Sequence, residues 1–212
     1  MTTIVCFGDS NTWGYNPASG GRYPAAERWV GVLATALEAK SPGAFSVIAE
    51  GQNGRTTVWD DPFEGPKNGS LYLLPCLESH KPVDLLVIML GTNDLKHRFG
   101  LSAWDIAHGA ARLVEVAQAS AFGPGDRPPR VLLIAPPPVG RLSNFAGMFE
   151  GAAETSKGLS EAFAAVAAEL PCDFLDAGRV VRSSDRDGIH LDPEGHRALG
   201  NAVAERVLVA LP

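Results

Sequence analysis

The stretch DLLVIML at residues 84–90, followed at once by GTND at residues 91–94, decides the fold. Every residue after Asp84 in the first segment is apolar, so apolar and polar positions do not alternate. A strand of this kind is buried on both faces, which is typical of the centre of a parallel sheet. Small and polar residues follow directly, at the strand end where open α/β sheets bind their ligands. The stretch therefore predicts a central parallel strand that leads into a functional site.

Segments on either side repeat this arrangement, because apolar runs alternate with helical patterns. We expect the other strands at residues 3–8, 45–51, 130–138 and 172–177. Helical patterns cover residues 28–40, 70–80, 102–120, 151–170 and 192–211. We expect Pro75 to break the second helix, and Asp192 and Pro193 to begin the last one. The alternation predicts a three-layer α/β/α sandwich around a parallel sheet of about five strands. A length of 212 residues predicts one domain, residues 1–212.

Composition and charge argue against several classes of protein. The net charge is −6 and no cluster of lysine and arginine appears, so we expect no nucleic-acid partner. No apolar run is long enough to cross a bilayer, and Met1-Thr2-Thr3 lacks the basic region of a signal peptide, so we expect no membrane partner. The cysteines show no metal-ligand spacing and favour reduced thiols in the cytoplasm. They are Cys6, Cys76 and Cys172. We expect neither a metal nor an organic cofactor.

The first predicted strand also ends in a polar segment, within IVCFGDSNTWG at residues 4–14. Ser10 at this place is either a turn residue or a nucleophile, and a serine nucleophile needs an adjacent base. His190 is the best candidate base, because it lies between the last strand and the last helix, three residues after Asp187. We expect helical or helix-capping positions for three other histidines and a place at the border of the site for a fourth. The three are His80, His108 and His196, and the fourth is His97.

Three further residues complete a candidate site for acyl chemistry. A tight turn in DRDGIHLDPEGH at residues 185–196 would aim the Asp187 carboxylate at the His190 imidazole, as the third group of a nucleophilic triad does. Backbone N–H groups and asparagine side chains stabilise a tetrahedral oxyanion, and Asn93 and Gly54 each follow a predicted strand. Taken alone, each segment also fits a structural turn: solvated charges, an asparagine turn or a left-handed glycine.

Residues beside these segments are candidates for the substrate pocket. Trp13 fits either a pocket wall or a core position. Four polar residues are expected to hold the loops around the site by hydrogen bonds. They are Asp9, Asn11, Arg55 and Asp94. The apolar segment 136–151 fits a lid, a pocket wall, a subunit contact or plain core packing. Its large side chains are Phe145, Met148 and Phe149, and Trp59 in segment 59–70 is a candidate for a subunit contact.

The order of these segments resembles that of the SGNH hydrolases, also called the GDSL esterase family. The family's blocks are matched by Gly8-Asp9-Ser10, Gly54, residues 91–94 and residues 187–190, which together span nearly the whole chain. The resemblance implies a flavodoxin-like sheet and a Ser-His-Asp hydrolase, with Ser10 as nucleophile, His190 as base and Asp187 as its orienter. It also implies oxyanion donors at the Ser10 N–H, the Gly54 N–H and the Asn93 side chain. The Gly-x-Ser-x-Gly motif of α/β-hydrolases does not occur.

Longer matches resemble the bacterial arylesterase branch of this family, which includes acyltransferases and perhydrolases. They are CFGDSNTWGYNP at 6–17, RWVGVLA at 28–34, GRTTVWDDP at 54–62, the run 68–96 and FEGAAETSKGLS at 149–160. The branch implies small-molecule ester substrates, namely short-chain aryl and alkyl esters, with alcohols or hydrogen peroxide as acyl acceptors beside water. It also implies a homo-oligomer, an octamer in some members.

Other readings stay open at this stage. Within the family, the alternatives are a carbohydrate acetylesterase, a thioesterase and a lysophospholipase. Outside the enzymes, the alternative is a binding module that kept the fold and lost catalysis. The complete set of Ser10, Asn93, Asp187 and His190 argues against the binding module.

Overall fold

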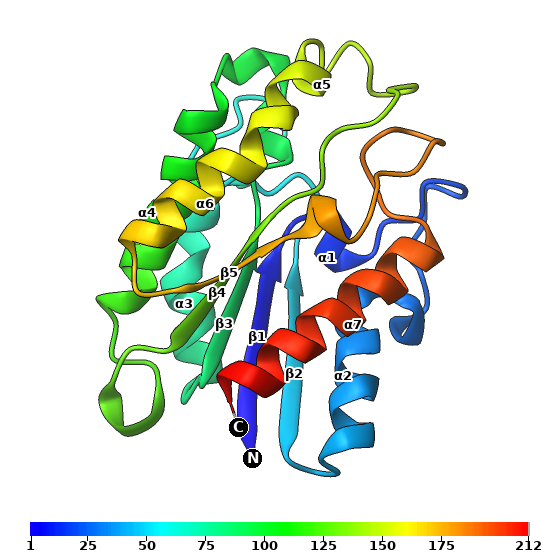
Figure 1. The fold of residues 1–212 in the computed structure, drawn as a ribbon. Helices are drawn as coiled ribbons and strands as arrows, with labels where there is room; N and C mark the ends of the chain where they lie inside the picture. Colours follow the sequence, from blue (N-terminus) through cyan, green and yellow to red (C-terminus); the bar gives the residue numbers. More distant parts are fainter. Residues whose placement is uncertain (212) are drawn as a thin grey trace.

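The computed structural model describes residues 1–211 and contains one five-stranded parallel sheet between two layers of helices (Figure 1). The strands are β1 (Thr2–Gly8), β2 (Phe45–Gly51), β3 (Leu85–Met89), β4 (Arg130–Ala135) and β5 (Asp173–Asp176). Their order across the sheet is β2-β1-β3-β4-β5, and every pair is parallel. This is the flavodoxin-like order, in which the chain reverses its direction of winding between β1 and β3. The predicted three-layer fold is confirmed.

Two sets of helices cover the sheet, and both are visible in Figure 1. One face carries α2 (Trp29–Lys40) and α7 (Pro193–Ala210), and the other carries α3 (Gly69–His80), α4 (Ala103–Gln118) and α6 (Leu159–Glu169). Two short helices are α1 (Ser10–Trp13) and α5 (Ala152–Thr155). Single 3-10 turns are Ala25–Glu27, Asn93–Leu95, His97–Phe99, Pro124–Asp126, Ser156–Gly158 and Ala177–Arg179. Among the described residues, no helix combines the length and apolar character that a bilayer span requires.

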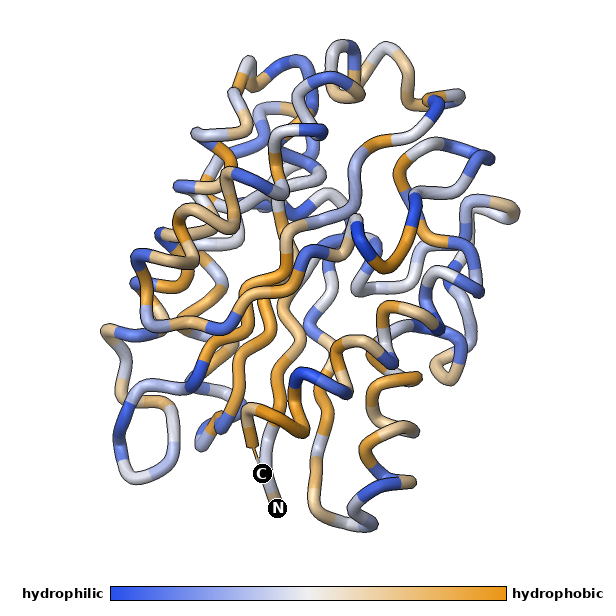
Figure 2. The backbone as a smooth tube through the Cα atoms, viewed as in Figure 1, coloured by the Kyte–Doolittle hydropathy of each residue, from blue (hydrophilic) through white to orange (hydrophobic). Residues whose placement is uncertain are grey.

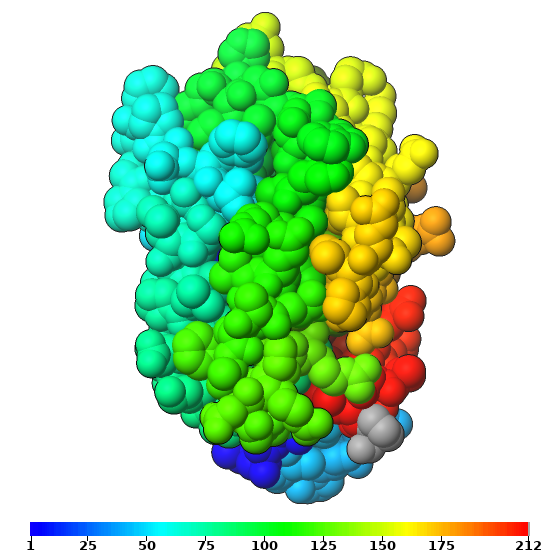
Figure 3. Space-filling view, turned by 90° about the vertical axis from the view of Figure 1, so that its left-hand side faces the viewer, coloured from blue at the N-terminus to red at the C-terminus, as the bar shows by residue number. Residues whose placement is uncertain are grey.

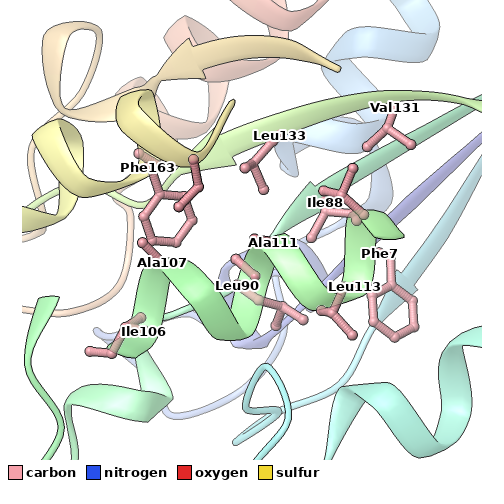
Figure 4. Packing of buried hydrophobic residues seen from close by; sticks show 14 of the residues in the cluster. Phe7, Ile88, Leu90, Ile106, Ala107, Ala111, Leu113, Val131, Leu133 and Phe163 are labelled. Atoms are coloured by element: carbon pink, nitrogen blue, oxygen red, sulfur yellow. The ribbon is translucent and has the colours of Figure 1, made fainter. Parts of the chain in front are cut away.

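The core has two halves, one on each side of the sheet. Leu85, Val87 and Met89 of β3 face α2 and α7, whereas Leu86 and Ile88 face α3, α4 and α6, so β3 is buried on both faces as its sequence predicts. Apolar residues concentrate along the strands between the helical layers (Figure 2). Figure 4 shows the α4 side of this packing. Each fully buried leucine or isoleucine side chain stabilises the fold by roughly 1.5–3 kcal/mol.

Three predicted elements differ from the structure. Helix α3 runs through Pro75 from Gly69 to His80 without a break. Proline has no N–H to donate to the carbonyl of Leu71, and both Leu71 and Pro75 lie on the exposed face of α3, where a helix tolerates this loss better than in the core. Strand β4 ends at Ala135, before the three prolines that were expected to belong to it, because proline offers no N–H to the ladder. The predicted helix 151–170 is divided into α5 and α6 by a 3-10 turn.

Helix α2 begins with an unusual cap. Arg28 makes no side-chain capping bond, and the first helical N–H, that of Trp29, donates to Nδ1 of His196 on α7 at 3.2 Å. This contact joins α2 to α7 on one face of the sheet and satisfies an N–H that a helix cannot satisfy itself. His196 is wholly buried, and burial lowers the pKa of its imidazole to about 4. The imidazole is therefore neutral at physiological pH.

The buried histidine predicts a pH-dependent stability. In the unfolded chain His196 protonates near pH 6.5, whereas in the folded chain it stays neutral until about pH 4. The unfolded state binds more protons in this window, so stability falls as the pH is lowered. Between pH 7.5 and 4.5 the loss is roughly 2–3 kcal/mol. Urea unfolding of the unmodified chain and of His196→Asn should differ in pH dependence by this amount.

The exposed His108 offers the control. His108→Asn should leave the pH dependence of unfolding as it is in the unmodified chain. Equal pH dependences for His196→Asn and the unmodified chain would contradict the assignment.

Candidate active site

The carboxyl ends of β1, β2 and β3 lie at the same edge of the sheet, and α1 starts there directly after β1 (Figure 1). Two strand-end glycines let α1 lie against this edge. A Cβ on Gly8 would stand 2.1 Å from Thr12 Oγ1, and one on Gly51 would stand 2.2 Å from the backbone N of Trp13. No side chain larger than hydrogen fits at either position. Ser10 is consequently held as the first residue of α1, beside the switch point of the sheet.

A continuous hydrogen-bond chain joins Ser10, His190 and Asp187. The Ser10 Oγ lies 2.9 Å from His190 Nε2, and His190 Nδ1 lies 2.6 Å from Asp187 Oδ2. The second carboxylate oxygen of Asp187 accepts the backbone N–H groups of Ile189 and His190 at 2.9 and 3.0 Å. Because Nδ1–H donates to the carboxylate, Nε2 is free to accept the Ser10 proton. The arrangement can turn a hydroxyl into a nucleophile.

Asp187 is held in its charged form. Burial alone would raise the pKa of its carboxyl group, but the hydrogen bonds from the side chain and backbone of His190 outweigh burial and hold the pKa below its usual range. A carboxylate in this position favours the imidazolium that forms when His190 takes a proton.

Asn11 ties the two halves of this chain together. Its Nδ2 donates to the Ile189 carbonyl at 3.3 Å, and the Leu191 N–H donates to its Oδ1 at 3.0 Å. The side chain thus fixes the loop after β5 to the turn after β1 from both sides of His190. Asn11 therefore holds the loop by hydrogen bonds, as expected. Its expected place in the wall of the pocket is wrong, because it does not border the cavity.

Three N–H donors lie around Ser10. The Ser10 N–H starts α1 and has no acceptor within the helix. No hydrogen bond among residues 1–211 uses the Gly54 N–H. Gly54 has φ +82°, a backbone conformation that favours glycine, and a Cβ there would stand 2.5 Å from Glu64 Oε2. Asn93 Nδ2 donates to the Arg55 carbonyl at 3.1 Å, with a longer contact to Asp9 at 3.4 Å. The Ser10 and Gly54 N–H groups can stabilise an oxyanion on a carbonyl bound at Ser10, and Asn93 Nδ2 can join them by exchanging its longer contact to Asp9 for the oxyanion.

A cavity of about 420 Å³ opens in front of Ser10 and His190. The apolar wall of its lining consists of Tyr15, Phe145, Met148, Phe149 and Ile189. The polar wall consists of Asn53, Gly54, Glu64, Lys67, Asn93 and Lys96. The segment after β4 therefore supplies a pocket wall, and Phe145 and Phe149 line the cavity as expected.

The remaining predicted pocket residues point elsewhere. Arg55 is buried beneath the loop, where its Nη1 donates to the carbonyls of Gly8 and Glu50 and its guanidinium lies 4.2 Å from the centre of the Phe7 ring. Asp94 is also buried and accepts both the N–H and the hydroxyl of Thr57. These two side chains hold the loops after β2 and β3, which is the supporting role expected of them, and neither borders the cavity.

Asp9 and Trp13 also lie outside the cavity lining. The Asp9 carboxylate accepts the Asn11 N–H at 2.9 Å, and burial raises the pKa of Asp9 to about 6. The Trp13 ring packs against the Arg22 guanidinium at 4.7 Å. Asp9 caps α1, and Trp13 supports the loop that follows α1.

Several pocket residues were not foreseen. Lys96 is buried and its ammonium bonds Asp61 at 3.2 Å and Glu64 at 2.8 Å, and Arg98 pairs with the same two carboxylates. This ion cluster holds segment 59–68 so that Glu64 and Lys67 reach the cavity. No sequence signal marks it, because its members lie on separate loops. Tyr15 could have been found from the sequence, because it follows directly after the turn that carries Ser10.

The other histidines and the cysteines are absent from the cavity wall. His80 pairs with Glu50 at 2.7 Å rather than capping its helix, His108 stacks on Trp104, and His97 is exposed outside the cavity. Burial raises the pKa of all three cysteine thiols, that of Cys76 to about 12. A thiol that stays protonated is a poor nucleophile.

The chain is similar to a known protein family and to solved structures. The profile of the GDSL-like lipase/acylhydrolase family matches residues 6–198. Est24, a carbohydrate acetylesterase from Sinorhizobium meliloti, is 40% identical with a TM-score of 0.93. The aryl esterase of M. smegmatis is 41% identical with a TM-score of 0.93. Both matches cover 100% of each chain. No curated protein sequence gave a match.

The family match covers Ser10, Gly54, Asn93 and His190, and the similar structures extend over the complete chain. Sequence identities of 40% and 41% over the full length of both chains indicate a shared family as well as a shared fold. This chain therefore belongs to the GDSL-like lipase/acylhydrolase family and is a carboxylic ester hydrolase of the serine esterase type.

Proposed function

We propose that Ser10, His190 and Asp187 hydrolyse short-chain aryl and alkyl esters through an acyl-enzyme. The observation that carries the proposal is the hydrogen-bond chain from Ser10 through His190 to Asp187, at a cavity bordered by N–H donors.

In the first half of the reaction, Ser10 Oγ forms a bond to the ester carbonyl carbon while its proton passes to His190 Nε2. The carbonyl oxygen becomes an oxyanion that accepts N–H bonds from Ser10, Gly54 and Asn93. When the carbonyl re-forms, the bond to the alcohol oxygen breaks and His190 gives that oxygen its proton. A water then repeats the sequence on the acyl-enzyme, releasing the acid and restoring the Ser10 hydroxyl.

The cavity supports small esters as substrates. A volume of about 420 Å³ is within the range of small-molecule pockets, and its apolar wall of Tyr15, Phe145, Met148 and Phe149 suits an aryl or alkyl group. The polar wall with Asn53, Glu64 and Lys67 supports a second candidate, an acetylated carbohydrate, which offers hydroxyls to such groups. One similar structure is an aryl esterase and another a carbohydrate acetylesterase.

A substrate panel tests the proposal. We expect the purified chain to release p-nitrophenol faster from the acetate than from the octanoate, and a p-nitrophenyl phosphonate to label Ser10. Acetylated xylan hydrolysed faster than the aryl acetate would favour the carbohydrate candidate. A chain that hydrolyses no ester and resists the phosphonate would instead be a binding module.

The apolar wall also supports acyl transfer to acceptors other than water. An acyl-enzyme at Ser10 facing Phe145 and Phe149 would favour an alcohol or hydrogen peroxide that packs there. Adding a primary alcohol to the p-nitrophenyl acetate reaction should give the new ester beside acetic acid. Acid alone would argue for a simple hydrolase.

We also propose that the chain forms a homo-oligomer, an octamer by its resemblance to the arylesterase branch. The side of the molecule seen in Figure 3 carries α3 and α4. Large apolar side chains are exposed on these helices and on the loop before α3: Trp59, Phe63, Leu71, Leu74 and Trp104. Exposed apolar side chains of this kind are common in subunit contacts. Sedimentation velocity should give a mass several times 22.3 kDa.

The free cysteines support a reducing, cytoplasmic location.

Replacing Asn93 by alanine tests the oxyanion donors. Removing one such donor lowers kcat by about a hundred- to a thousandfold. KM for p-nitrophenyl acetate should change much less, because the donor acts mainly on the charge that develops in the transition state. Asn201→Ala on the exposed face of α7 is the matched control and should keep full activity. An Asn93→Ala chain with unchanged kcat would remove this residue from the oxyanion donors.

A further inference from the structure

The ring of Tyr15 lies over the imidazole of His190. The two ring centres are 4.1 Å apart and the planes differ by 34°, a tilted stack in close contact. Phe145 approaches the same imidazole with its edge, at 6.0 Å and 68°. Two aromatic rings therefore pack against the imidazole, while its nitrogens face Ser10 and Asp187. The hydrogen bonds align the nitrogens, and the rings oppose tilting of the imidazole plane.

Tyr15 is positioned by the same turn that positions Ser10. Helix α1 ends at Gly14 in the left-handed conformation, with φ +90°, and the N–H groups of Gly14 and Tyr15 both donate to the Ser10 carbonyl, at 2.8 and 2.9 Å. A bridge between Tyr15 and Arg22 fixes the other side of the residue. These contacts set the position of the Tyr15 backbone relative to Ser10 locally.

An aromatic face in this position favours a positive charge. The face of a ring is the negative side of its quadrupole, and a cation close to it is stabilised, most strongly where water is excluded. In the proposed mechanism His190 Nε2 accepts the Ser10 proton and the ring becomes an imidazolium as Ser10 attacks, so the stack strengthens in the transition state. Interactions that strengthen only there accelerate the chemical step.

We propose that Tyr15 is a positioning residue for His190, whose ring face holds the imidazole between Ser10 and Asp187 and stabilises the imidazolium. The inference rests on the proposed Ser10–His190–Asp187 mechanism. It adds a role that Tyr15 plays on the base, separate from its contact with substrate as part of the cavity wall.

Other ionisable groups near His190 belong to different elements. Asp187 lies on the same turn, Asp9 on the turn after β1, and His196 on α7. The two carboxylates favour the imidazolium when they are charged. Burial lowers the pKa of His196 to about 4, so His196 is neutral near pH 7 and does not oppose the imidazolium. All three groups stay in place when Tyr15 is changed, so a comparison of Tyr15 variants isolates the ring.

The hydroxyl of Tyr15 is not part of the inference. It points toward Gly20, where a Cβ would stand 3.8 Å from it. Tyr15→Phe keeps the ring face and removes only this hydroxyl, whereas Tyr15→Leu keeps an apolar wall and removes the ring. The two variants form a matched pair.

The test is the pH dependence of kcat and kcat/KM for p-nitrophenyl acetate. We expect Tyr15→Phe to leave the acidic limb of kcat/KM at the pH found for the unmodified chain, because the ring face stays over His190. In Tyr15→Leu, kcat should fall roughly tenfold, and the acidic limb of kcat/KM should move about half a unit to lower pH, since the imidazolium has lost a stabilising contact. KM should change less than kcat. Tyr15→Met replaces Tyr15→Leu if the latter does not fold.

Several outcomes would overturn the inference. These are an unmoved acidic limb in the folded Leu or Met variant, an equal shift in Tyr15→Phe, or a change in KM alone, which would leave Tyr15 only a wall of the pocket. NMR titration of His190 in a Ser10→Ala background gives a second readout without turnover, and the Tyr15→Leu change should lower that midpoint too. Ester hydrolysis that survives Ser10→Ala would refute the proposed function itself, whatever the Tyr15 variants do.

Discussion

Ser10→Ala should lower kcat for p-nitrophenyl acetate by about a millionfold. The variant removes the only group that forms the covalent bond, and the proton path to His190 loses its donor. Binding and the remaining N–H donors of Gly54 and Asn93 stay, so a residual rate above that of water is expected. A stopped-flow burst of p-nitrophenol, if the unmodified chain gives one, should also vanish.

Stability offers a check on this experiment. Ser10 is nearly buried and its side chain bonds His190, so the alanine variant should unfold within about 1 kcal/mol of the unmodified chain. Ser79→Ala, on the exposed side of α3, controls for the substitution itself. If Ser10→Ala hydrolysed the ester as fast as Ser79→Ala does, a different nucleophile would have to be sought.

Asp187→Asn should lower kcat by about ten-thousandfold. The amide can keep its oxygen on the N–H groups of Ile189 and His190, so the turn should survive. Its NH₂ would then face His190 Nδ1, which must accept instead of donate. The imidazole proton would move to Nε2 and point at Ser10, leaving the hydroxyl without a base.

Asp185 supplies the control for this substitution. It lies two residues before Asp187 and is exposed, so Asp185→Asn makes the same chemical change without contact to the imidazole. We expect full activity from it. Ester hydrolysis by Asp187→Asn within tenfold of the Asp185→Asn rate would mean that another group orients His190.

The sheet could be predicted from the sequence because its signals are local. The unbroken apolar run of β3 indicates a strand buried on both faces, and the helical patterns between strands require parallel crossovers. The wrong expectation at Pro75 has a physical cause. Whether proline breaks a helix depends on how the freed carbonyl is satisfied, and that depends on which face of α3 meets the core.

The site was predictable to the extent that topology dictates it. Segments that follow parallel strands meet at one edge, so Ser10, Gly54 and Asn93 could be expected to lie together before any coordinates were known. The direction in which each side chain points could not be predicted. Arg55 and Asp94 sit beside Gly54 and Asn93 in the chain, but they turn inward to hold the loops.

The polar wall of the cavity depends on contacts that no local pattern reveals. Lys96 would be read as a solvated charge, and only the carboxylates of Asp61 and Glu64 explain its burial. Tyr15 differs, because its place directly after the Ser10 turn makes it a candidate from the sequence. Its neighbour Trp13 carried the stronger hydrophobic signal, yet the left-handed turn at Gly14 brings Tyr15 against the imidazole.

The hydrogen bond between Ser10 and His190 spans 180 residues of sequence. During synthesis His190 therefore leaves the ribosome 180 residues after Ser10, and after all five strands of the sheet. A nascent chain can therefore complete the sheet strand by strand and still lack its base. Ester hydrolysis is for this reason a reporter of the finished fold. In a refolding experiment, activity should return only with the last structural change, when the segment before α7 closes over the turn after β1.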